Sequence, residues 1–521
     1  MVRFPRITLG FVWMLLPPIL TLVYVGTLVQ YPLDFWHHLV TGRQIAQSGA
    51  ASGPDLFTYT IAGQEIVNQS WLAQWIIYCL YRRGGFALVH FFFAACYALA
   101  IGLIGYTAWQ RCRRSRVAAA LTLAAMALAA SNFGVRPQAM SLVLFAAELV
   151  VLWHFSEDCG HHVPMVVVGV GVAAVALIEI LWTNCHGAFP LGIALPGLFL
   201  LAAAATVWRR QGLSAVWSDR RIWVYLACVA AALVAAFCSP HFRHTADYFF
   251  VVASRSTQRQ IGEWLPTELG TYTGTAFYVS LLLAIAILAG NVKQVTATET
   301  LLLVVFGLLG CTAQRMVVWW GMLLPAVLAP HLAAIARRWR KSAAVNEVPG
   351  TMSGTVSGTM YPWSWSGSAA NFVVLGLLLG WAAFGTPWTR AFNPLLPAEK
   401  RRTDPPDEPR AAVALLRQTG FAGRLFQPME WGSYLSWHLY PQVTIFADGR
   451  LDSFPDPVWN DYVRIGNADE GWESLLDSYG IDCVVWDPRL SPRLPAALRS
   501  SGRWELVGSD SVCVVFRRQR T

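Results

Sequence analysis

Residues 7–30 read ITLGFVWMLLPPILTLVYVGTLVQ, a stretch that contains no charged side chain. A transmembrane helix needs about 20 predominantly apolar residues, so this segment is long enough to cross a bilayer. It is too long for the apolar region of a signal peptide and has no small-residue cleavage site, so we expect a retained helix. Comparable stretches recur as far as residue 388. The sequence therefore predicts a polytopic α-helical membrane protein.

The overall composition agrees with a lipid bilayer as the surrounding medium. Hydrophobic residues make up 55% of the 521 residues, charged residues make up 13%, and the mean hydropathy is +0.44. A soluble globular chain carries about twice that share of charge. From Lys400 onward there are 15 Lys and Arg against 16 Asp and Glu, so the net charge of +9 belongs to the membrane part. We expect no nucleic acid partner.

We predict eleven membrane-spanning helices, at residues 7–30, 86–108, 117–134, 138–155, 163–183, 188–208, 222–238, 272–290, 299–313, 316–336 and 369–388. Basic residues fall in alternate loops, and the positive-inside rule assigns such loops to the cytoplasm. These basic positions lie at 3–6, 111–116, 209–221, 293 and 337–341. Eleven crossings from a cytoplasmic N-terminus place the C-terminus outside the inner membrane.

Two segments between the predicted helices need separate interpretations. The apolar stretch 71–81 is too short to span a bilayer, so we expect a helix lying in the outer membrane interface, with its Trp residues at headgroup depth. The first outer loop then covers residues 31–85. If this stretch crossed the membrane, every later loop would change side. Residues 342–368 are rich in Gly, Ser and Thr, which predicts a flexible cytoplasmic linker.

The pattern changes after the last predicted helix. The membrane domain, residues 1–393, is followed by a charged, proline-rich linker at 394–409 and by a predicted small extracytoplasmic α/β domain at 410–521. Helical periodicity marks 410–418 and 472–479, and strand-like runs lie at 423–427, 443–447, 483–486, 505–507 and 512–516. The ten cysteines show no metal-ligand spacing, and Cys483 and Cys513 are either a disulfide or two core thiols.

Polar residues from distant segments share the outer face in this topology. They are Asp34, His37, His38, Asp55, Arg136, Asn184, His186, Glu263 and Arg315. Within the helices, Glu179, Thr183 and His186 stand at i, i+4 and i+7 and therefore share one helix face. That face either lines a polar cavity or forms hydrogen bonds between packed helices. For Glu148, near mid-membrane, a packing role is the simpler interpretation.

Several motifs lie along this outer face. They are LDFWHHLVTGR at 33–43, PDLFTYT at 54–60, NQSWLAQW at 68–75, RPQ at 136–138, WTNCHGAF at 182–189, IGEW at 261–264, EWGSY at 430–434 and FADGR at 446–450. Together they resemble bacterial membrane proteins grouped with the type C glycosyltransferases, in their family 39-like branch. The resemblance covers nearly the whole chain and implies a type C-like membrane fold.

The resemblance also implies a chemistry. In characterised type C enzymes the donor is a polyprenyl-phosphate sugar, and an acidic residue after the first helix contacts the acceptor or a divalent cation. Asp34 matches that position, which makes it the candidate base or metal ligand. Asp55 or Glu263 would supply a second carboxylate. His37 and His38 would be auxiliary acid/base or metal groups.

The remaining candidates are expected to bind substrate. Cationic side chains would neutralise the departing lipid phosphate, a role for which Arg is well suited. The candidates are Arg136, Arg315, Arg259 and Arg43, with Asn184 and His186 beside them. In the C-terminal domain, Glu430, Asp448 and Arg450 could face a ligand, although Asp-Gly after a strand is more often simply a turn.

Two functional hypotheses follow. The first is a glycosyltransferase that moves a sugar from a polyprenyl-phosphate carrier to an extracytoplasmic lipid, glycan or protein, with Asp34 as base or metal ligand. The second is a non-catalytic membrane protein that binds or transports a carrier lipid or assists envelope assembly. Asp34→Asn separates the two hypotheses, because it abolishes transfer in the first and is nearly silent in the second.

Overall fold

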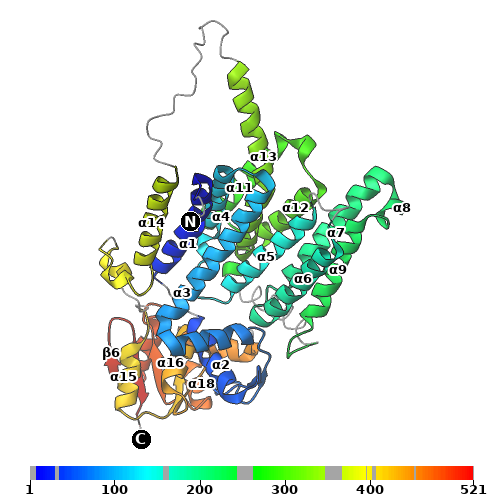
Figure 1. Ribbon diagram of the computed structural model, residues 1–521. Helices are drawn as coiled ribbons and strands as arrows, with labels where there is room; N and C mark the ends of the chain where they lie inside the picture. The colour runs from blue at the N-terminus through cyan, green and yellow to red at the C-terminus, as the bar shows by residue number, and fades with distance from the viewer. Residues whose placement is uncertain are drawn as a thin grey trace.

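The chain folds as a bundle of long helices with a sheet-containing unit packed against one end (Figure 1). The computed structural model describes residues 7–29, 34–156, 163–242, 262–345, 367–394, 396–401, 407–450 and 453–519. Arg259 lies outside these residues, as does most of the predicted cytoplasmic linker.

Each of the eleven predicted spans contains a helix. The helices are α1 Leu9–Thr27, α3 Trp71–Cys112, α4 Ser115–Ala129, α5 Gln138–Ser156, α6 Met165–Cys185, α7 Pro190–Gln211, α9 Arg220–Ala236, α11 Tyr272–Ala289, α12 Ala297–Thr312, α13 Val317–Val345 and α14 Gly367–Phe384. Within the described residues, eight helices are long and apolar enough to cross a membrane. Because α9, α12 and α14 are not among these eight, the number of crossings stays a prediction.

The outward faces of the helices fit a lipid environment. Val166, Val170 and Leu177 of α6 are all more than half exposed, as expected where a bilayer and not water surrounds the helix. Large apolar side chains such as Trp182 and Trp320 are fully buried between helices. The chain is therefore a membrane protein with a packed helical core.

The apolar stretch at 71–81 forms the start of α3, which is interrupted at a glycine pair. Gly84 and Gly85 leave helical geometry, and Gly85 has φ +60°, a value that glycine adopts without steric strain. The segment before this break packs against α2, Phe35–Ser48. A Cβ atom at Gly42 of α2 would overlap the backbone oxygen of Gln74, so glycine allows this close approach. Whether the segment lies in the membrane interface stays a prediction.

The residues from 410 onward build a five-stranded sheet of order β4-β3-β5-β7-β6. The strands are β3 Gly423–Phe426, β4 Val443–Ile445, β5 Cys483–Trp486, β6 Trp504–Ser509 and β7 Val514–Arg518, and each overlaps a predicted strand. β4, β3 and β5 are parallel, whereas β7 is antiparallel to both β5 and β6. Cys483 and Cys513 are both buried free thiols.

Five helices accompany this sheet: α15 Arg410–Gln418, α16 Met429–Leu439, α17 Asp456–Asn467, α18 Trp472–Ser478 and α19 Arg493–Ser500. Successive strand residues enter different cores, since Leu425 packs with α15 and α16 while Phe426 packs with α17, α18 and α19. The sheet is thus covered on both faces. Periodicity predicted only α15 and α18. α13 continues to Val345, and short 3₁₀ turns occupy Arg390–Phe392 and Ala398–Arg401, while the domain and linker bounds stay predictions.

Candidate functional site

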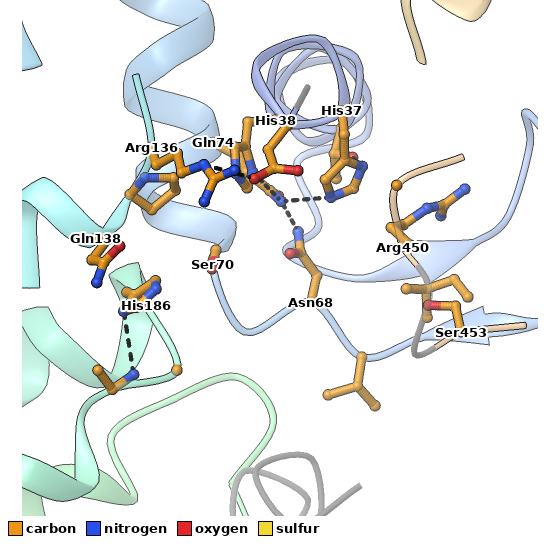
Figure 2. A pocket seen from close by; sticks show the side chains of 18 of the residues that line it. His37, His38, Asn68, Ser70, Gln74, Arg136, Gln138, His186, Arg450 and Ser453 are labelled. Atoms are coloured by element: carbon orange, nitrogen blue, oxygen red, sulfur yellow. Dashed lines mark hydrogen bonds and ion pairs between the residues drawn. The ribbon is translucent and has the colours of Figure 1, made fainter. Parts of the chain in front are cut away.

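A cavity of about 660 Å³ lies where the helix ends meet the C-terminal sheet (Figure 2). Its walls come from α2, the first outer loop, the start of α5, the end of α6, the turns at residues 262–264 and 314–316, and α16. The predicted site residues that line it are Asp34, His37, His38, Arg136, His186, Glu263, Arg315, Glu430 and Arg450. The structure therefore gathers residues from seven segments of the sequence around one space.

Four of these residues form an alternating ion-pair chain. Oδ2 of Asp34 lies 3.0 Å from Nε of Arg136, and Nη1 of Arg136 lies 3.4 Å from Oε2 of Glu263. Nη1 of Arg315 lies 3.4 Å from Oε1 of Glu263 and completes the chain. Asp34 is the N-cap residue of α2, but its side chain makes no capping hydrogen bond and reaches Arg136 instead.

The ion-pair chain is electrically balanced and open to the cavity. The side chains of Asp34, Arg136 and Glu263 are 37%, 40% and 42% exposed. The neighbouring carboxylates, first Asp34 and then Glu263, raise the pKa of Arg136 against the opposing effect of burial. Arg315 also lies over the Trp264 ring, 4.2 Å from its centroid. Both guanidinium groups are thus held beside the space that a ligand would occupy.

The three cavity histidines are neutral at physiological pH. Burial lowers the pKa of His37 to about 3, with the neighbouring His38 adding to the effect. Burial also lowers the pKa of His38 to about 4, although Asp34 opposes this shift. For His186 the pKa falls to about 3 through burial and through the charge of Arg315.

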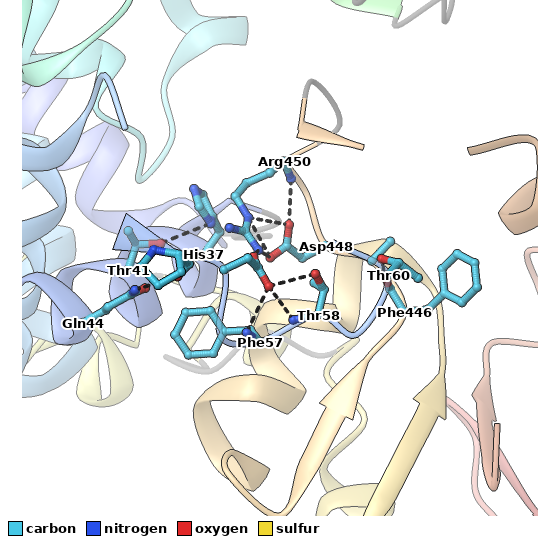
Figure 3. Close-up of polar contacts among 12 residues, drawn as sticks. His37, Thr41, Gln44, Phe57, Thr58, Thr60, Phe446, Asp448 and Arg450 are labelled. Carbon is cyan, nitrogen blue, oxygen red and sulfur yellow. Dashed lines mark hydrogen bonds and ion pairs between the residues drawn. The ribbon is translucent and has the colours of Figure 1, made fainter. Parts of the chain in front are cut away.

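Asp55, Asp448 and Arg450 form a second polar group, the Arg450 clasp, next to the cavity (Figure 3). Nη2 of Arg450 lies 2.5 Å from Oδ2 of Asp55 and 2.7 Å from Oδ2 of Asp448. Although burial opposes it, the two carboxylates raise the pKa of Arg450. Oδ1 of Asp55 accepts hydrogen bonds from the backbone N–H and the hydroxyl of Thr58, both at 2.8 Å. Of the clasp, only Arg450 lines the cavity.

The clasp fixes the first outer loop to the C-terminal sheet. Beside it, the N–H of Tyr59 donates to the Ile445 oxygen at 3.1 Å, and the N–H of Ile445 donates to the Phe57 oxygen at 3.0 Å. The hydroxyl of Thr60 donates to the Phe446 oxygen at 2.6 Å (Figure 3). Residues 57–60 therefore extend the sheet along β4. The structure places Asp55 in this junction rather than beside Asp34.

Asn184 also lies outside the cavity lining. Its Oδ1 accepts from Nε1 of Trp71 at 2.6 Å, and its Nδ2 donates to the Cys238 oxygen at 2.8 Å, so it joins α6 to the start of α3 and to the loop after α9. Glu179 and Glu148 are buried, and their carboxyl groups have no hydrogen-bond partner among the described residues. Of the predicted face of Glu179, Thr183 and His186, only His186 reaches the cavity. Burial raises the pKa of Glu430, which also lines the cavity.

The described donor set does not fit a tightly held metal ion. Within the described residues, no group of three His, Cys, Asp or Glu side chains is arranged to hold one. Asp34 pairs with Arg136, and Glu263 pairs with both Arg136 and Arg315. A divalent cation at Asp34 would lie beside a guanidinium group and would have one nearby carboxylate instead of several.

Several neutral site residues were not singled out from the sequence. Gln74 lies between His37 and His38, Asn68 contacts Gln74, and Ser141 contacts His186. Asn68 and Gln74 belong to the NQSWLAQW motif, which is the one signal that could have identified them. Their importance depends on partners from other segments, and those partners become visible only in the fold.

The chain shares its fold with solved membrane glycosyltransferases. The oligosaccharyltransferase of Archaeoglobus fulgidus, tethered with an acceptor peptide, is similar with a TM-score of 0.55 and 12% identity, covering 95% of this chain and 72% of that one. The archaeal oligosaccharyltransferase AglB of the same organism was solved in complex with an inhibitory peptide and a dolichol-phosphate. It is similar with a TM-score of 0.55 and 11% identity, and the match covers 92% of this chain and 70% of that one. ArnT from Cupriavidus metallidurans in the apo state is similar with a TM-score of 0.51 and 16% identity, and the match covers 97% of each chain.

No protein-family model and no curated protein matches the chain. At identities of 11% to 16%, the structural similarity establishes the fold alone. The chain therefore has the fold of the type C membrane glycosyltransferases. The expected membership of the family 39-like branch stays a proposal.

Proposed function

We propose that this protein transfers a sugar from a polyprenyl-phosphate carrier to an extracytoplasmic acceptor, with Asp34 as the base. The ion-pair chain of Asp34, Arg136, Glu263 and Arg315 carries the proposal, because it places a carboxylate and two guanidinium groups in one cavity. The similarity to AglB, solved with a dolichol-phosphate, supports a lipid-phosphate donor. We further propose membership of the family 39-like branch on the motifs at 33–43 and 68–75.

The residues fit an inverting displacement. The acceptor hydroxyl loses its proton to Asp34 and its oxygen forms a bond to the anomeric carbon. The bond from that carbon to the phosphate oxygen breaks, and its electron pair leaves with the lipid phosphate. Arg136 and Arg315 stabilise the negative charge on that phosphate. No metal takes part in this scheme, since both carboxylates of the ion-pair chain, Asp34 and Glu263, already have an arginine partner.

We place this cavity on the extracytoplasmic side of a bacterial inner membrane, on the positive-inside distribution of basic loops. The placement requires that the segment before Gly84 does not cross the membrane. A periplasmic reporter fused after Arg83 should be active and a cytoplasmic reporter fused there should be silent. The reverse pattern would contradict the placement.

A non-catalytic carrier-lipid protein is the second candidate. One observation favours it: Oδ2 of Asp34 is already 3.0 Å from Arg136, so the carboxylate could serve only to orient the guanidinium group. In that case the arginines would matter for lipid binding and the acidity of Asp34 would not.

The test is a comparison of polyprenyl-linked sugars and envelope glycans from cells that carry Asp34→Asn, with the wild type and a gene deletion beside it. We expect Asp34→Asn to reproduce the deletion profile while the protein accumulates normally in the membrane. The matched control is Glu65→Gln, an exposed carboxylate of the same outer loop, which should keep the wild-type profile. A wild-type profile for Asp34→Asn would support the second candidate and contradict the first.

A further inference from the structure

A hydrogen-bond relay beside the cavity fixes the orientation of the His38 ring. The relay starts at the backbone oxygen of Ala51, which can only accept, so the nitrogen Nδ2 of Asn68 must face it, at 3.3 Å. The same Nδ2 donates to Oε1 of Gln74 at 2.6 Å. With its oxygen held in this way, Gln74 directs its NH₂ group toward the histidines.

The NH₂ group of Gln74 has a hydrogen for each ring. Its Nε2 lies 3.3 Å from Nδ1 of His38 and 3.4 Å from Nε2 of His37 (Figure 2). A ring nitrogen that accepts a hydrogen bond carries no proton, so a neutral His38 has its proton on Nε2. Among the described residues, no group forms a hydrogen bond with Nε2 of His38. This atom is not fully buried either, so it is open to the cavity that His38 lines.

His186 is held in the same Nε2–H tautomer by a separate set of contacts. The backbone N–H of Ala188 donates to Nδ1 of His186 at 3.3 Å, as Figure 2 shows. The hydroxyl of Ser141 lies 2.9 Å from the same nitrogen, and its oxygen accepts from Nε1 of Trp182 at 2.8 Å, which leaves the hydroxyl proton for the histidine. The proton of a neutral His186 is therefore also on Nε2. Like Nε2 of His38, this atom has no hydrogen-bond partner among the described residues and is not fully buried, so it is open to the cavity.

We propose that His38 and His186 act as neutral Nε2–H donors that bind phosphate oxygens in the cavity, and that Asn68 and Gln74 are positioning residues that hold His38 in this form. A phosphate oxygen only accepts hydrogen bonds, so it matches a nitrogen that only donates. The ion-pair chain is already balanced, so these donors stabilise an entering phosphate without adding fixed positive charge. The lowered pKa values of both histidines agree with this assignment.

This inference deepens the proposed function, because the phosphate it names is that of the proposed carrier. It also gives the histidines a different role from acid/base or metal chemistry. A donor Nε2–H has no lone pair for a metal or for a proton, and Nδ1 is occupied by Gln74 in His38 and by Ser141 and Ala188 in His186. The roles of His38 and His186 are thus the same although they come from different elements, α2 and the end of α6.

The relay can be tested by nitrogen NMR of ¹⁵N-histidine-labelled protein in nanodiscs at pH 7, with signals assigned through His38→Gln and His186→Gln. We expect both residues to show the neutral Nε2–H tautomer. In Asn68→Asp the new carboxylate cannot donate to Gln74, so the Gln74 amide turns over and His38 becomes an Nδ1–H tautomer. His186 should not change, which shows that the variant is folded. Gln74→Met removes the donor and should give a mixture of His38 tautomers.

Gln64→Glu, an exposed position on the same loop, should leave both signals as in the wild type. An Nδ1–H or protonated His38 in the wild type, or an unchanged His38 in Asn68→Asp, would overturn the relay. The tests of the relay and of the proposed function can fail independently of each other. If the tautomers are as expected but Asp34→Asn still transfers sugar, the relay stands and the catalytic proposal falls.

Phosphate binding is tested by titration with polyprenyl phosphate and, separately, with inorganic phosphate. The carrier should shift the Nε2 signals of both histidines, and Asn68→Asp should weaken its binding by about tenfold, the equivalent of about 1.4 kcal/mol. If inorganic phosphate shifts them equally at the same concentration, the donors bind free phosphate and the lipid source is wrong. If neither compound shifts them, the donors do not bind phosphate.

Discussion

The chain contains two ion-paired clusters at opposite ends of α3, and they differ in one respect. Near Gln74, at the start of α3, the cavity holds the ion-pair chain, in which Arg315 is 20% exposed and the other three side chains are about two-fifths exposed. Near Arg111, in the last turn of α3, lies the buried ion cluster of Arg111, Glu299 and His331, with side chains 5%, 1% and 2% exposed. Both clusters join separate helices, but only the first is accessible to a ligand.

In the buried ion cluster, Arg111 and Glu299 are both held by several protein groups. Arg111 lies 2.9 Å from Glu299, donates to the Ala326 oxygen at 2.6 Å and covers the Trp153 ring at 3.6 Å. Glu299 also accepts from the Thr296 N–H at 2.8 Å in a capping box. The comparison teaches that charge buried and fully paired holds helices together, whereas charge left half open in a cavity remains available to bind.

The largest expected difference is in stability. Arg111→Gln leaves Glu299 buried without its guanidinium partner, and we expect the free energy of unfolding to fall by about 3–5 kcal/mol. Arg136→Gln removes a half-exposed pair and should lower it by less than about 1 kcal/mol. Unfolding in detergent measures both. Equal losses for the two variants would remove the distinction between the clusters.

The Arg450 clasp should behave like the buried cluster although it borders the cavity. Asp55→Asn removes one charge from a buried group but keeps the shape, so we expect a loss of about 2–3 kcal/mol. The junction between the first outer loop and the C-terminal sheet should also become more sensitive to protease. Glu65→Gln is the control on the same loop and should change neither quantity. If Asp55→Asn resisted protease as well as the wild type does, the clasp would not be needed to hold the junction.

Acidification should destabilise the cavity side through its neutral histidines. The pKa of His38 is about 4 when folded, against about 6.5 when unfolded, so between these values the unfolded chain binds a proton that the folded chain does not. Stability therefore falls as pH falls, by about 2 kcal/mol between pH 7 and pH 5 for this residue. His38→Gln should flatten the pH dependence measured by thermal unfolding. An unchanged slope would show that His38 is not held neutral.

The smallest expected effect is on Glu263. Glu263→Gln should change the free energy of unfolding by less than about 1 kcal/mol, because the Glu263 carboxylate is itself 42% exposed. It also removes one negative charge from beside Arg136 and Arg315, so we expect polyprenyl phosphate to bind about threefold more tightly, a gain of about 0.6 kcal/mol. Weaker lipid binding would indicate that Glu263 is needed to position the arginines.

Much of the fold could be predicted from the sequence, for physical reasons. Long uncharged stretches such as residues 7–30 have few alternatives to a helix in a membrane, and all eleven predicted ranges contain one. The five strands were also found, because short apolar runs between Gly, Pro and Asp leave little choice. α16 was missed because its sequence, MEWGSYLSWHL, mixes Gly, Ser and aromatic residues that favour a helix only once packed on the sheet.

The candidate site was less predictable. Asp34, Arg136, Glu263 and Arg315 were identified because charged residues stand out in an apolar chain. The positions of Asp55 and Asn184 were not predictable, since the pairing of residue 58 with Ile445 and the contact of Asn184 with Trp71 join distant segments. Asn68 and Gln74 carry no charge, and their roles arise from a relay that no local pattern reveals.

The most direct test of the central claim is a single-turnover assay with purified protein in nanodiscs that contain a radiolabelled polyprenyl-phosphate sugar and acceptor-rich membrane extract. The measured quantity is the rate at which free polyprenyl phosphate forms. We expect Asp34→Asn to slow this rate by at least about 100-fold while carrier-lipid affinity stays within about threefold of the wild type. Release of polyprenyl phosphate by Asp34→Asn at the wild-type rate would contradict the claim that Asp34 is the base of a glycosyltransferase.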